Sequence, residues 1–170
     1  MNISKSTEFS IRLACNQDFE EIFEIWQKGL SASFDITQID LAEVKIVFLE
    51  NFLLRKGIFN YWIAVNEFKQ IIGWQSLNKC TVNPIKTNQF AESSTYVRHE
   101  ARHLGVGYAL LDYVIKEAEK DRDLKYITAY VAKSNIAIRK ITNELGWLEI
   151  GDLPDLVGNE IQKLFIVRPV

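Results

Sequence analysis

The fold of this chain is decided by the stretch Thr95-Tyr96-Val97-Arg98-His99-Glu100-Ala101-Arg102-His103-Leu104-Gly105-Val106-Gly107-Tyr108-Ala109-Leu110-Leu111. It continues a run of β-forming residues, passes through a short polar segment and then places apolar residues at helical spacing from Val106 to Val114. The pattern Arg-x-x-Gly-x-Gly stands where the period changes. The stretch therefore predicts a strand, a loop and a helix whose start carries two glycines.

A helix start of this kind is suited to binding an anion. The first backbone N–H groups of a helix have no partner inside the helix, and the helix dipole adds partial positive charge there. Gly105 and Gly107 leave the backbone open to a phosphate, and Arg102 and a protonated His103 add charge. Two glycines near a helix start also occur in ordinary turns, so these residues alone leave both interpretations open.

The strand that leads into this loop is expected over residues 90–97, and it carries one carboxylate. Alternation places Glu92 on the same face as Tyr96, among residues that are otherwise apolar or small. A carboxylate on a central strand loses hydration, which raises its pKa toward the range in which a general base works at neutral pH. The alternative is a glutamate that faces solvent or forms an ion pair.

Downstream of the glycine helix, residues 124–131 predict a strand parallel to residues 90–97, because a helix connects the two. Asn135 then precedes a helix that ends at Gly146. An Asn at this position is suited to cap the helix, and a cap can also contact a ligand.

The remaining elements complete an order β-α-α-β-β-β-α-β-α-β-β, which predicts an α/β fold with a mixed sheet and helices on both faces. Asn16 or Asp18 is expected to cap the first helix. The other expected elements are a strand at 9–13, a helix with Phe19, Ile22, Phe23, Trp26 and Leu30 on its apolar face, a helix at 40–55 with Leu41, Val44, Val47, Phe48 and Phe52 on its apolar face, a hairpin of strands 61–65 and 70–77, a loop at 79–89, and closing strands at 147–150 and 161–167.

Length and composition fit one domain over residues 1–170, with residues 1–8 expected to be flexible. The chain has 170 residues, 48% of them hydrophobic, and a formal net charge of −2. This charge argues against a nucleic-acid-binding protein, which would show a basic patch. The sequence has no signal-peptide pattern and no apolar run long enough to span a bilayer, so we expect a cytoplasmic protein without membrane contact.

Cysteine and histidine give weaker signals. Cys15 and Cys80 stand far apart and are expected to be small buried or half-buried residues rather than a disulfide or a zinc site. His99 and His103 flank the start of the glycine loop, but further ligands at compatible spacing are missing. We therefore expect no metal site.

Two motifs together make the chain resemble the GNAT superfamily of acetyl-CoA-dependent N-acetyltransferases. The family's glycine loop, Gln/Arg-x-x-Gly-x-Gly/Ala, is matched by Arg102, Gly105 and Gly107. A later motif with an Asn and then Leu-Gly-Phe is matched by Asn135 and Leu145-Gly146-Trp147. Within the superfamily, residues 92–97 and the upstream segments 11–14 and 33–35 are similar to phosphinothricin acetyltransferases.

The resemblance implies a mostly antiparallel central sheet whose one parallel strand pair is splayed at the cofactor cleft. It implies that Glu92 takes a proton from the substrate ammonium, directly or through water, and that a backbone N–H near Val97 stabilises the oxyanion. We expect Phe34 and Trp74 to contact the substrate. The residues expected to bind acetyl-CoA are Thr95, Tyr96, Val97, Arg102, His103, Leu104, Gly105, Val106, Gly107, Tyr108 and Asn135.

The sequence departs from the family at two places. Seven residues after Asn135, many members have a Tyr or His that protonates the departing thiolate, whereas this chain has Thr142. The thiolate must then leave without side-chain help, take a proton from water, or use another tyrosine. The segment Leu153 to Gln162 also lacks the family's Gly-Tyr-Lys-x-Gly-x-Trp-like stretch, which leaves phosphinothricin itself in question as the acceptor.

The sequence therefore predicts an N-acetyltransferase that moves the acetyl group of acetyl-CoA to the primary amine of a small molecule. An amino acid, or an analogue such as phosphinothricin or methionine sulfoximine, is the expected acceptor, and a homodimer is the expected assembly because such relatives are commonly dimers. The alternative is a non-catalytic sensor that has kept the acyl-CoA cleft. Thr142 favours the sensor and Glu92 favours the enzyme. A dinucleotide oxidoreductase fits poorly, because the loop lacks the first glycine of Gly-x-Gly-x-x-Gly.

Overall fold

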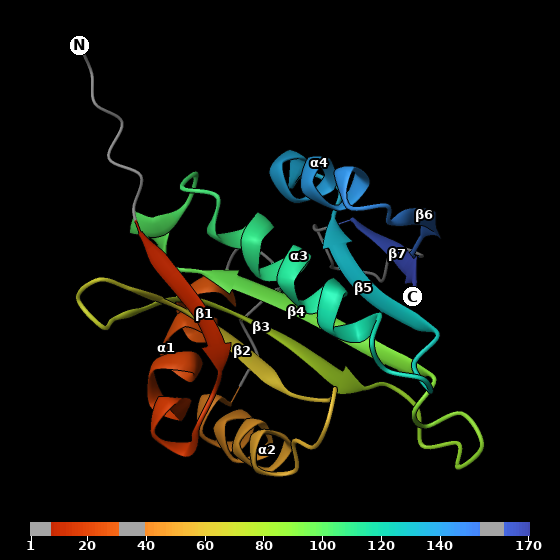
Figure 1. Ribbon diagram of the computed structural model, residues 1–170, viewed down its shortest axis with the longest axis horizontal. Helices are drawn as coiled ribbons and strands as arrows, with labels where there is room; N and C mark the ends of the chain where they lie inside the picture. Colours follow the sequence, from red (N-terminus) through yellow and green to blue (C-terminus); the bar gives the residue numbers. More distant parts are fainter. Residues whose placement is uncertain (1–7, 31–39, 154–161) are drawn as a thin grey trace.

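The computed structural model describes residues 8–30, 40–153 and 162–170 (Figure 1). The order of helices and strands is the predicted one, with two short 3-10 helices at Asn16–Asp18 and His99–Ala101. The elements are β1 (Phe9–Leu13), α1 (Phe19–Gly29), α2 (Leu41–Leu53), β2 (Tyr61–Asn66), β3 (Ile71–Lys79), β4 (Phe90–Val97), α3 (Val106–Ala118), β5 (Tyr126–Ala132), α4 (Ile136–Glu144), β6 (Leu148–Asp152) and β7 (Lys163–Pro169).

The strands form one seven-stranded sheet in the order β1-β2-β3-β4-β5-β7-β6. Each neighbouring pair is antiparallel except β4 and β5, which are parallel. The predicted hairpin of β2 and β3 and the predicted parallel pair are both confirmed. Because β4 and β5 are joined through α3, the chain returns to the same end of the sheet before β5 begins.

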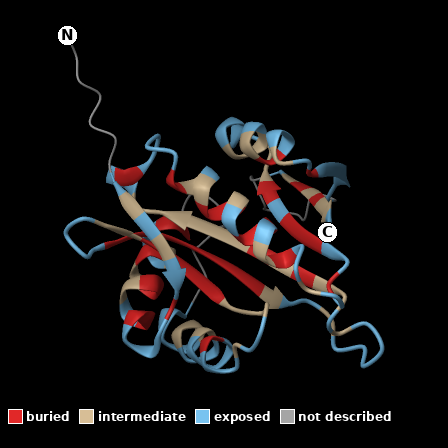
Figure 2. Ribbon diagram, in the orientation of Figure 1, coloured by how far each residue is buried: buried red, intermediate tan, exposed pale blue. Residues whose placement is uncertain are grey.

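Helices cover both faces of the sheet, as predicted. Neighbouring residues of a strand point to opposite faces. Trp74 and Tyr96 belong to the hydrophobic cluster formed with α1 and α2, whereas Val97 packs with Val106 and Leu110 of α3. Figure 2 shows the buried residues concentrated along the central strands and on the sides of α1 and α3 that face them.

The core under α1 is aromatic. Phe19, Ile22 and Phe23 are buried and Trp26 is partly buried, which confirms the predicted apolar face of the first helix. The ring of Phe48 from α2 lies within about 6 Å, centroid to centroid, of five other aromatic rings. Contacts of this geometry add to the free energy gained from burying apolar area.

The apolar face predicted for the second helix is only partly right. Phe52 is fully buried and Phe48 is half-buried, but Leu41 is 38% exposed and Val47 is 51% exposed. The helix carries apolar residues around most of its circumference, with Ile46, Leu49 and Leu53 also exposed. Spacing alone therefore could not select the side that contacts the sheet.

Two further expectations were wrong: the burial of the two cysteines and the capping of α1 by Asp18. Cys15 and Cys80 are both exposed. The carboxylate of Asp18 does not cap α1. It accepts hydrogen bonds from the Arg12 guanidinium, at 2.8 and 2.9 Å, and from the Cys15 N–H, at 2.7 Å. Burial acts to raise the Asp18 pKa, but these hydrogen bonds outweigh it and hold that pKa at about 2.

Two remaining expectations concern the first residues of the chain and contact with a membrane. Of the residues expected to be flexible, 1–8, all except Glu8 lie outside the described ranges. Within the described ranges, no helix combines the length and the hydropathy needed to cross a bilayer.

Candidate active site

The parallel strands β4 and β5 separate beyond Glu92. Their pairing covers three residue pairs, from Phe90 to Glu92 on β4, although β4 continues to Val97 and β5 to Ala132. Between the separated halves lies a cavity of about 300 Å³. Its lining comprises Glu92, Ser93, Ser94, Thr95, Tyr96, Leu111, Ala129, Tyr130, Val131, Ala132, Asn135, Ile138, Thr142, Trp147, Leu153, Lys163 and Ile166.

Glu92 stands where the two strands part. It is half-buried, and it pairs across the sheet with Asn78 of β3 and Thr128 of β5. Burial raises the pKa of its carboxyl group above the ordinary value, as predicted from its strand position. No ion pair within the described part of the chain involves Glu92, so the solvent-facing or paired alternative does not describe this side chain.

A second hollow reaches Glu92 from another direction. This groove of about 680 Å³ runs between the C-terminal end of α2, the end of β3 and the turn before β5, and Glu92 is the one described residue that lines both spaces. Three of its cations, Arg55, Lys56 and Lys79, take part in none of the ion pairs among the described residues. The groove is lined by Asn51, Leu54, Arg55, Lys56, Gly57, Ile58, Phe59, Asn78, Lys79, Asn88, Glu92, Asp121 and Asp123.

The end of β4 is held tightly on the α1 side. The ring of Tyr96 stacks on Trp74 at a centroid distance of 5.0 Å. A Cβ atom at Gly29 of α1 would stand 2.6 Å from Cδ1 of Tyr96, and one at Gly73 would stand 3.0 Å from the Tyr96 carbonyl oxygen. Gly73 therefore marks a close backbone approach, as its place inside a strand suggested.

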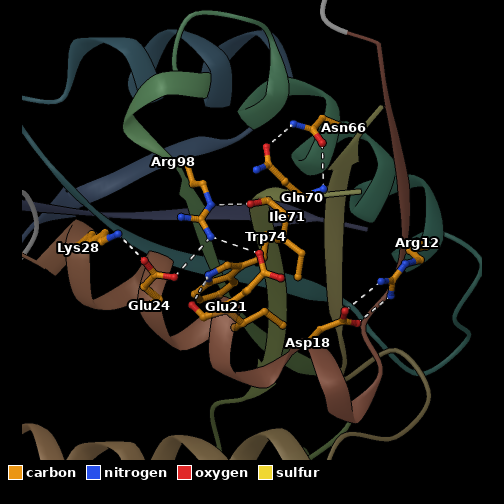
Figure 3. Close-up of polar contacts among 11 residues, drawn as sticks. Arg12, Asp18, Glu21, Glu24, Lys28, Asn66, Gln70, Ile71, Trp74 and Arg98 are labelled. Atoms are coloured by element: carbon orange, nitrogen blue, oxygen red, sulfur yellow. Dashed lines mark hydrogen bonds and ion pairs between the residues drawn. The ribbon is translucent and has the colours of Figure 1, made fainter. Parts of the chain in front are cut away.

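Trp74 does not fit the substrate contact expected for it. Its side chain is 1% exposed, and the indole N–H donates to the Ile22 carbonyl at 2.9 Å (Figure 3). It is also absent from the described linings of the cavity and the groove. Trp74 instead supports the Tyr96 ring from within the core. Phe34, the other residue expected to contact the substrate, lies outside the described residues.

Sequence reasoning missed a buried amide behind the β4 wall. Gln75 is fully buried, and its amide nitrogen donates to the Ser93 hydroxyl at 2.6 Å. Its amide oxygen accepts a hydrogen bond from the Thr95 hydroxyl. One side chain of β3 thus satisfies and orients two cavity-lining hydroxyls of β4. The sequence offered no signal for this pairing, because it depends on the register between two strands.

The glycine loop joins β4 to α3 in the expected way. Gly105 precedes α3 with φ of 79°, which favours glycine, and the structure gives this helix no side-chain cap. His103 also has a positive φ, of 64°. A Cβ atom at Gly107 would meet only Val97 Cγ2, at 3.7 Å. The first N–H groups of α3 therefore stay available to an anion, beside an open surface at Gly107.

The predicted cofactor residues fall into two groups. Thr95, Tyr96 and Asn135 line the cavity, whereas Arg102, His103, Leu104, Gly105 and Tyr108 are exposed on the loop and first turn that follow β4. Val97 lies at the junction of the two, Gly107 is half-buried, and Val106 is buried against the sheet. An elongated ligand could contact both groups, with an anion at the loop and a narrow arm in the cavity.

Asn135 and Thr142 have defined partners on α4. The side-chain oxygen of Asn135 caps the helix by accepting from the Ile138 N–H at 3.2 Å, which confirms the predicted cap. The buried Thr142 hydroxyl is directed at the carbonyl oxygens of Ile138 and Arg139, at 3.0 and 3.1 Å. Its proton is therefore engaged by the backbone and is not presented to the cavity.

The cavity wall also includes one unsatisfied donor. Trp147 is 5% exposed, and its indole nitrogen is the only buried side-chain nitrogen or oxygen without a hydrogen-bond partner in the part of the chain that the structure describes. The same part of the chain shows no group of three or more His, Cys, Asp and Glu side chains placed to hold a metal ion.

Comparison with known proteins agrees with this geometry. The sequence matches the model of the acetyltransferase (GNAT) family over residues 19–147, which is more than half of the chain. The chain belongs to this family. The match spans α1 to Trp147 and so includes Glu92, the glycine loop and Asn135. A search among curated protein sequences gave no match.

Solved structures of the GNAT fold align with almost the whole chain. A ribosomal-protein-alanine N-acetyltransferase from Brucella melitensis is 26% identical, with 95% of this chain and 99% of that one covered and a TM-score of 0.78. A phosphinothricin acetyltransferase from Sinorhizobium meliloti, in complex with acetyl-CoA, is 21% identical, with 95% and 88% covered and a TM-score of 0.76. An N-acetyltransferase from Staphylococcus aureus Mu50 is 20% identical, with 96% and 99% covered and a TM-score of 0.78.

Proposed function

We propose that this protein transfers the acetyl group of acetyl-CoA to the primary amine of a small molecule, with Glu92 as the general base. The observation that carries the proposal is the position of Glu92, which lines both the cavity between β4 and β5 and the groove beside α2. A base for acetyl transfer must be reached by two substrates at once. A half-buried glutamate that belongs to the linings of both spaces fits this requirement.

The residues present fit acetyl-CoA. The uncapped start of α3 and Arg102 would hold the pyrophosphate, while Tyr96, Val97 and Asn135 would hold the pantetheine arm in the cavity. The unsatisfied indole N–H of Trp147 belongs to the same wall. When bound, acetyl-CoA supplies an acetyl group activated as a thioester.

In this proposal, Glu92 removes a proton from the acceptor amine. An alkylamine is protonated at neutral pH and has no lone pair for attack, so a proton must first be removed. Burial raises the Glu92 pKa, which makes the carboxylate a better proton acceptor than an exposed one. Glu92 takes the ammonium proton directly or through one water, and the amine nitrogen then becomes nucleophilic.

Protonation of the departing thiolate does not use Thr142 in this proposal, because that hydroxyl is engaged by two backbone carbonyls and is a weak acid. Tyr96 and Tyr130 are the tyrosines that line the cavity among the described residues, and a tyrosine or water takes this role. This geometry is also the observation that favours the second candidate function, a sensor that binds acyl-CoA without turnover.

The acceptor is proposed to be an amino acid or an analogue of the phosphinothricin or methionine sulfoximine type. Such molecules carry an anionic group near the amine. Arg55, Lys56 and Lys79 line this groove and form no ion pair among the described residues, although the carboxylates of Asp121 and Asp123 belong to the same lining. Cations at the wall of a partly enclosed groove attract such an anion more strongly than cations in bulk water.

An acceptor screen tests the function. The protein is incubated with acetyl-CoA and a panel of amino acids, phosphinothricin, methionine sulfoximine, polyamines and a peptide with an N-terminal alanine, while free thiol release is followed. We expect release with an acceptor that carries a carboxylate or phosphinate, and a higher KM for that acceptor in Lys79→Ala. Tight acetyl-CoA binding without thiol release on any amine would instead support the sensor.

A further inference from the structure

A charged cluster holds the point where β4 leaves the sheet. Arg98 directly follows β4, and its side chain is 17% exposed. Its Nε donates to the Ile71 carbonyl at 2.7 Å, and its backbone N–H donates to the Ile72 carbonyl at 2.9 Å. The guanidinium also reaches carboxylate oxygens of Glu21, at 3.3 Å, and Glu24, at 3.6 Å (Figure 3).

Arg98 therefore joins three elements at one place. The carbonyls belong to the first two residues of β3, the carboxylates belong to α1, and the arginine belongs to the chain that has just left β4. Two parts of the proposed cofactor site lie on either side of it in sequence, Tyr96-Val97 before it and the loop from Arg102 to Gly105 after it.

One carboxylate of the cluster, that of Glu24, has a lowered pKa. Glu24 also binds Lys28, and the hydrogen bond from Lys28, with the positive charge of Arg98, lowers the Glu24 pKa. The carboxylate is consequently ionised throughout the neutral range. The guanidinium is always charged and offers several donors in one plane, so it can bind a backbone carbonyl and carboxylates together.

We propose that Arg98 is a positioning residue for cofactor binding: it fixes the end of β4 relative to the start of α3, so that the cavity and the anion site can contact one molecule. The inference rests on the proposed function. Binding an elongated ligand at two places requires their separation to be correct, and a small misplacement of either place weakens the whole contact.

A second arginine on the same side of the sheet supplies a matched control. Arg12 of β1 binds Asp18 through two nitrogens, at 2.8 and 2.9 Å, so it also ties a strand to the start of α1 (Figure 3). It lies far in sequence from the strand end and the glycine loop. If arginine–carboxylate pairs serve stability alone, loss of either arginine should have the same kind of effect.

The experiment compares Arg98→Ala, Arg98→Lys and Arg12→Ala by coenzyme A titration calorimetry, thermal unfolding and steady-state kinetics. For Arg98→Ala we expect the Kd for coenzyme A and the KM for acetyl-CoA to rise about tenfold, with kcat at saturating cofactor changed less than about twofold. Arg98→Lys should recover part of the affinity, because an ammonium keeps the charge but not the planar fork. Arg12→Ala should lower Tm and leave the Kd unchanged.

Unchanged coenzyme A affinity in Arg98→Ala would overturn the positioning role, whatever happens to Tm. Should Arg98→Ala fail to fold, the double variant Glu21→Ala/Glu24→Ala removes the side-chain contacts of Arg98 to α1 and leaves those to β3, and a Kd equal to that of the wild type would overturn the proposal equally. A wild-type protein that does not bind coenzyme A would overturn the proposed function as well. Wild-type binding together with an unaffected Arg98→Ala affinity overturns the positioning role alone.

Discussion

The two strands that form the cavity are built differently. The β4 wall carries the half-buried Glu92 and is tied to the rest of the protein by a full ladder to β3, the amide of Gln75 and the Arg98 cluster. The β5 wall presents Ala129, Tyr130, Val131 and Ala132 to the cavity, and its own ladder runs to β7. The proposed base and the polar side-chain contacts to neighbouring elements thus lie on the β4 wall, whereas the β5 wall contributes small apolar side chains and Tyr130.

Coverage of the sheet shows the same difference. On the face that carries Trp74 and Tyr96, α1 and α2 bury an aromatic cluster against β2 to β4. On β5, Ile127, Thr128, Ala129 and Val131 are buried, whereas Tyr126 and Tyr130 are 41% and 49% exposed. A strand whose side chains are locked by neighbours can hold a base within the tolerance that proton transfer requires. We therefore expect changes on β4 and the loop that follows it to affect function more than changes beyond β5.

The largest effect is expected where β4 leads into α3. Gly107→Trp should raise the Kd for coenzyme A at least about 100-fold, because the indole would cover the open surface at the helix start. The fold should survive, since a Cβ at this site has only an ordinary contact with Val97. Gly151→Trp, on the exposed strand β6 with open space around it, is the control. Calorimetry that finds retained affinity in Gly107→Trp would refute our placement of the pyrophosphate.

The second-largest effect is expected from replacing Glu92, the proposed base on β4. Glu92→Gln should lower kcat about 10²- to 10³-fold at neutral pH, within the range of general-base contributions, and should flatten the rise of rate with pH. Since burial raises the Glu92 pKa, the wild-type rate should climb at a pH above the ordinary range of a glutamate. Glu43→Gln, the same change at an exposed carboxylate of α2, should leave the profile unaltered. An unchanged profile in Glu92→Gln would exclude Glu92 as the base.

Replacing Glu92 should lower activity but should not lower the stability of the fold at pH 7. The raised pKa means that the folded protein binds the Glu92 proton more tightly than the unfolded chain does. The contribution of Glu92 to the free energy of unfolding is therefore most favourable below the ordinary carboxyl pKa and falls as pH rises through the raised one. Glu92→Gln removes this penalty, so its Tm at pH 7 should equal or exceed that of the wild type, and thermal unfolding at pH 4 and pH 7 measures the difference.

The smallest effect is expected beyond β5, at Asn135. Asn135→Ala removes the cap of α4, which should cost about 1 kcal/mol and lower Tm by about 2–4 °C. Asn135→Asp keeps an oxygen for the Ile138 N–H but loses the amide donor. It should therefore preserve Tm. The KM for acetyl-CoA should rise less than about tenfold, because only one hydrogen bond to the cofactor is lost. Equal KM values in Asn135→Asp and the wild type would restrict Asn135 to capping.

Sequence patterns predicted the elements of this fold well because most of them have a clear period. The hairpin of β2 and β3, the parallel pair β4 and β5, and the Asn135 cap all follow from local spacing or residue type. Prediction was weakest for α2, whose apolar residues surround the helix, and for Asp18, whose carboxylate binds Arg12 of β1 and the Cys15 N–H instead of the N–H groups of α1. For α2, packing against the sheet decided among faces that the apolar spacing left equal.

The candidate site divides in the same way. Glu92, the glycine loop and Asn135 could be found in the sequence, because a carboxylate in a strand, two glycines at a helix start and an Asn before a helix each have a physical meaning at one position. Gln75, Arg98 and the groove beside α2 could not, because each depends on residues brought together from different elements. Trp74 was misassigned since sequence does not reveal whether an aromatic side chain lines a cavity or fills the core.

The sequence by itself determined the family, the order of the elements and which residues are proposed to move a proton or bind a phosphate, because these follow from residue type and short spacing. The splay of the parallel pair was expected from the resemblance, but only the tertiary structure decided that it begins after Glu92, that Glu92 lines two spaces, and that an arginine beyond β4 is bound to β3 and α1. Strand separation and side-chain burial result from packing over the whole sheet, and no local pattern encodes that balance.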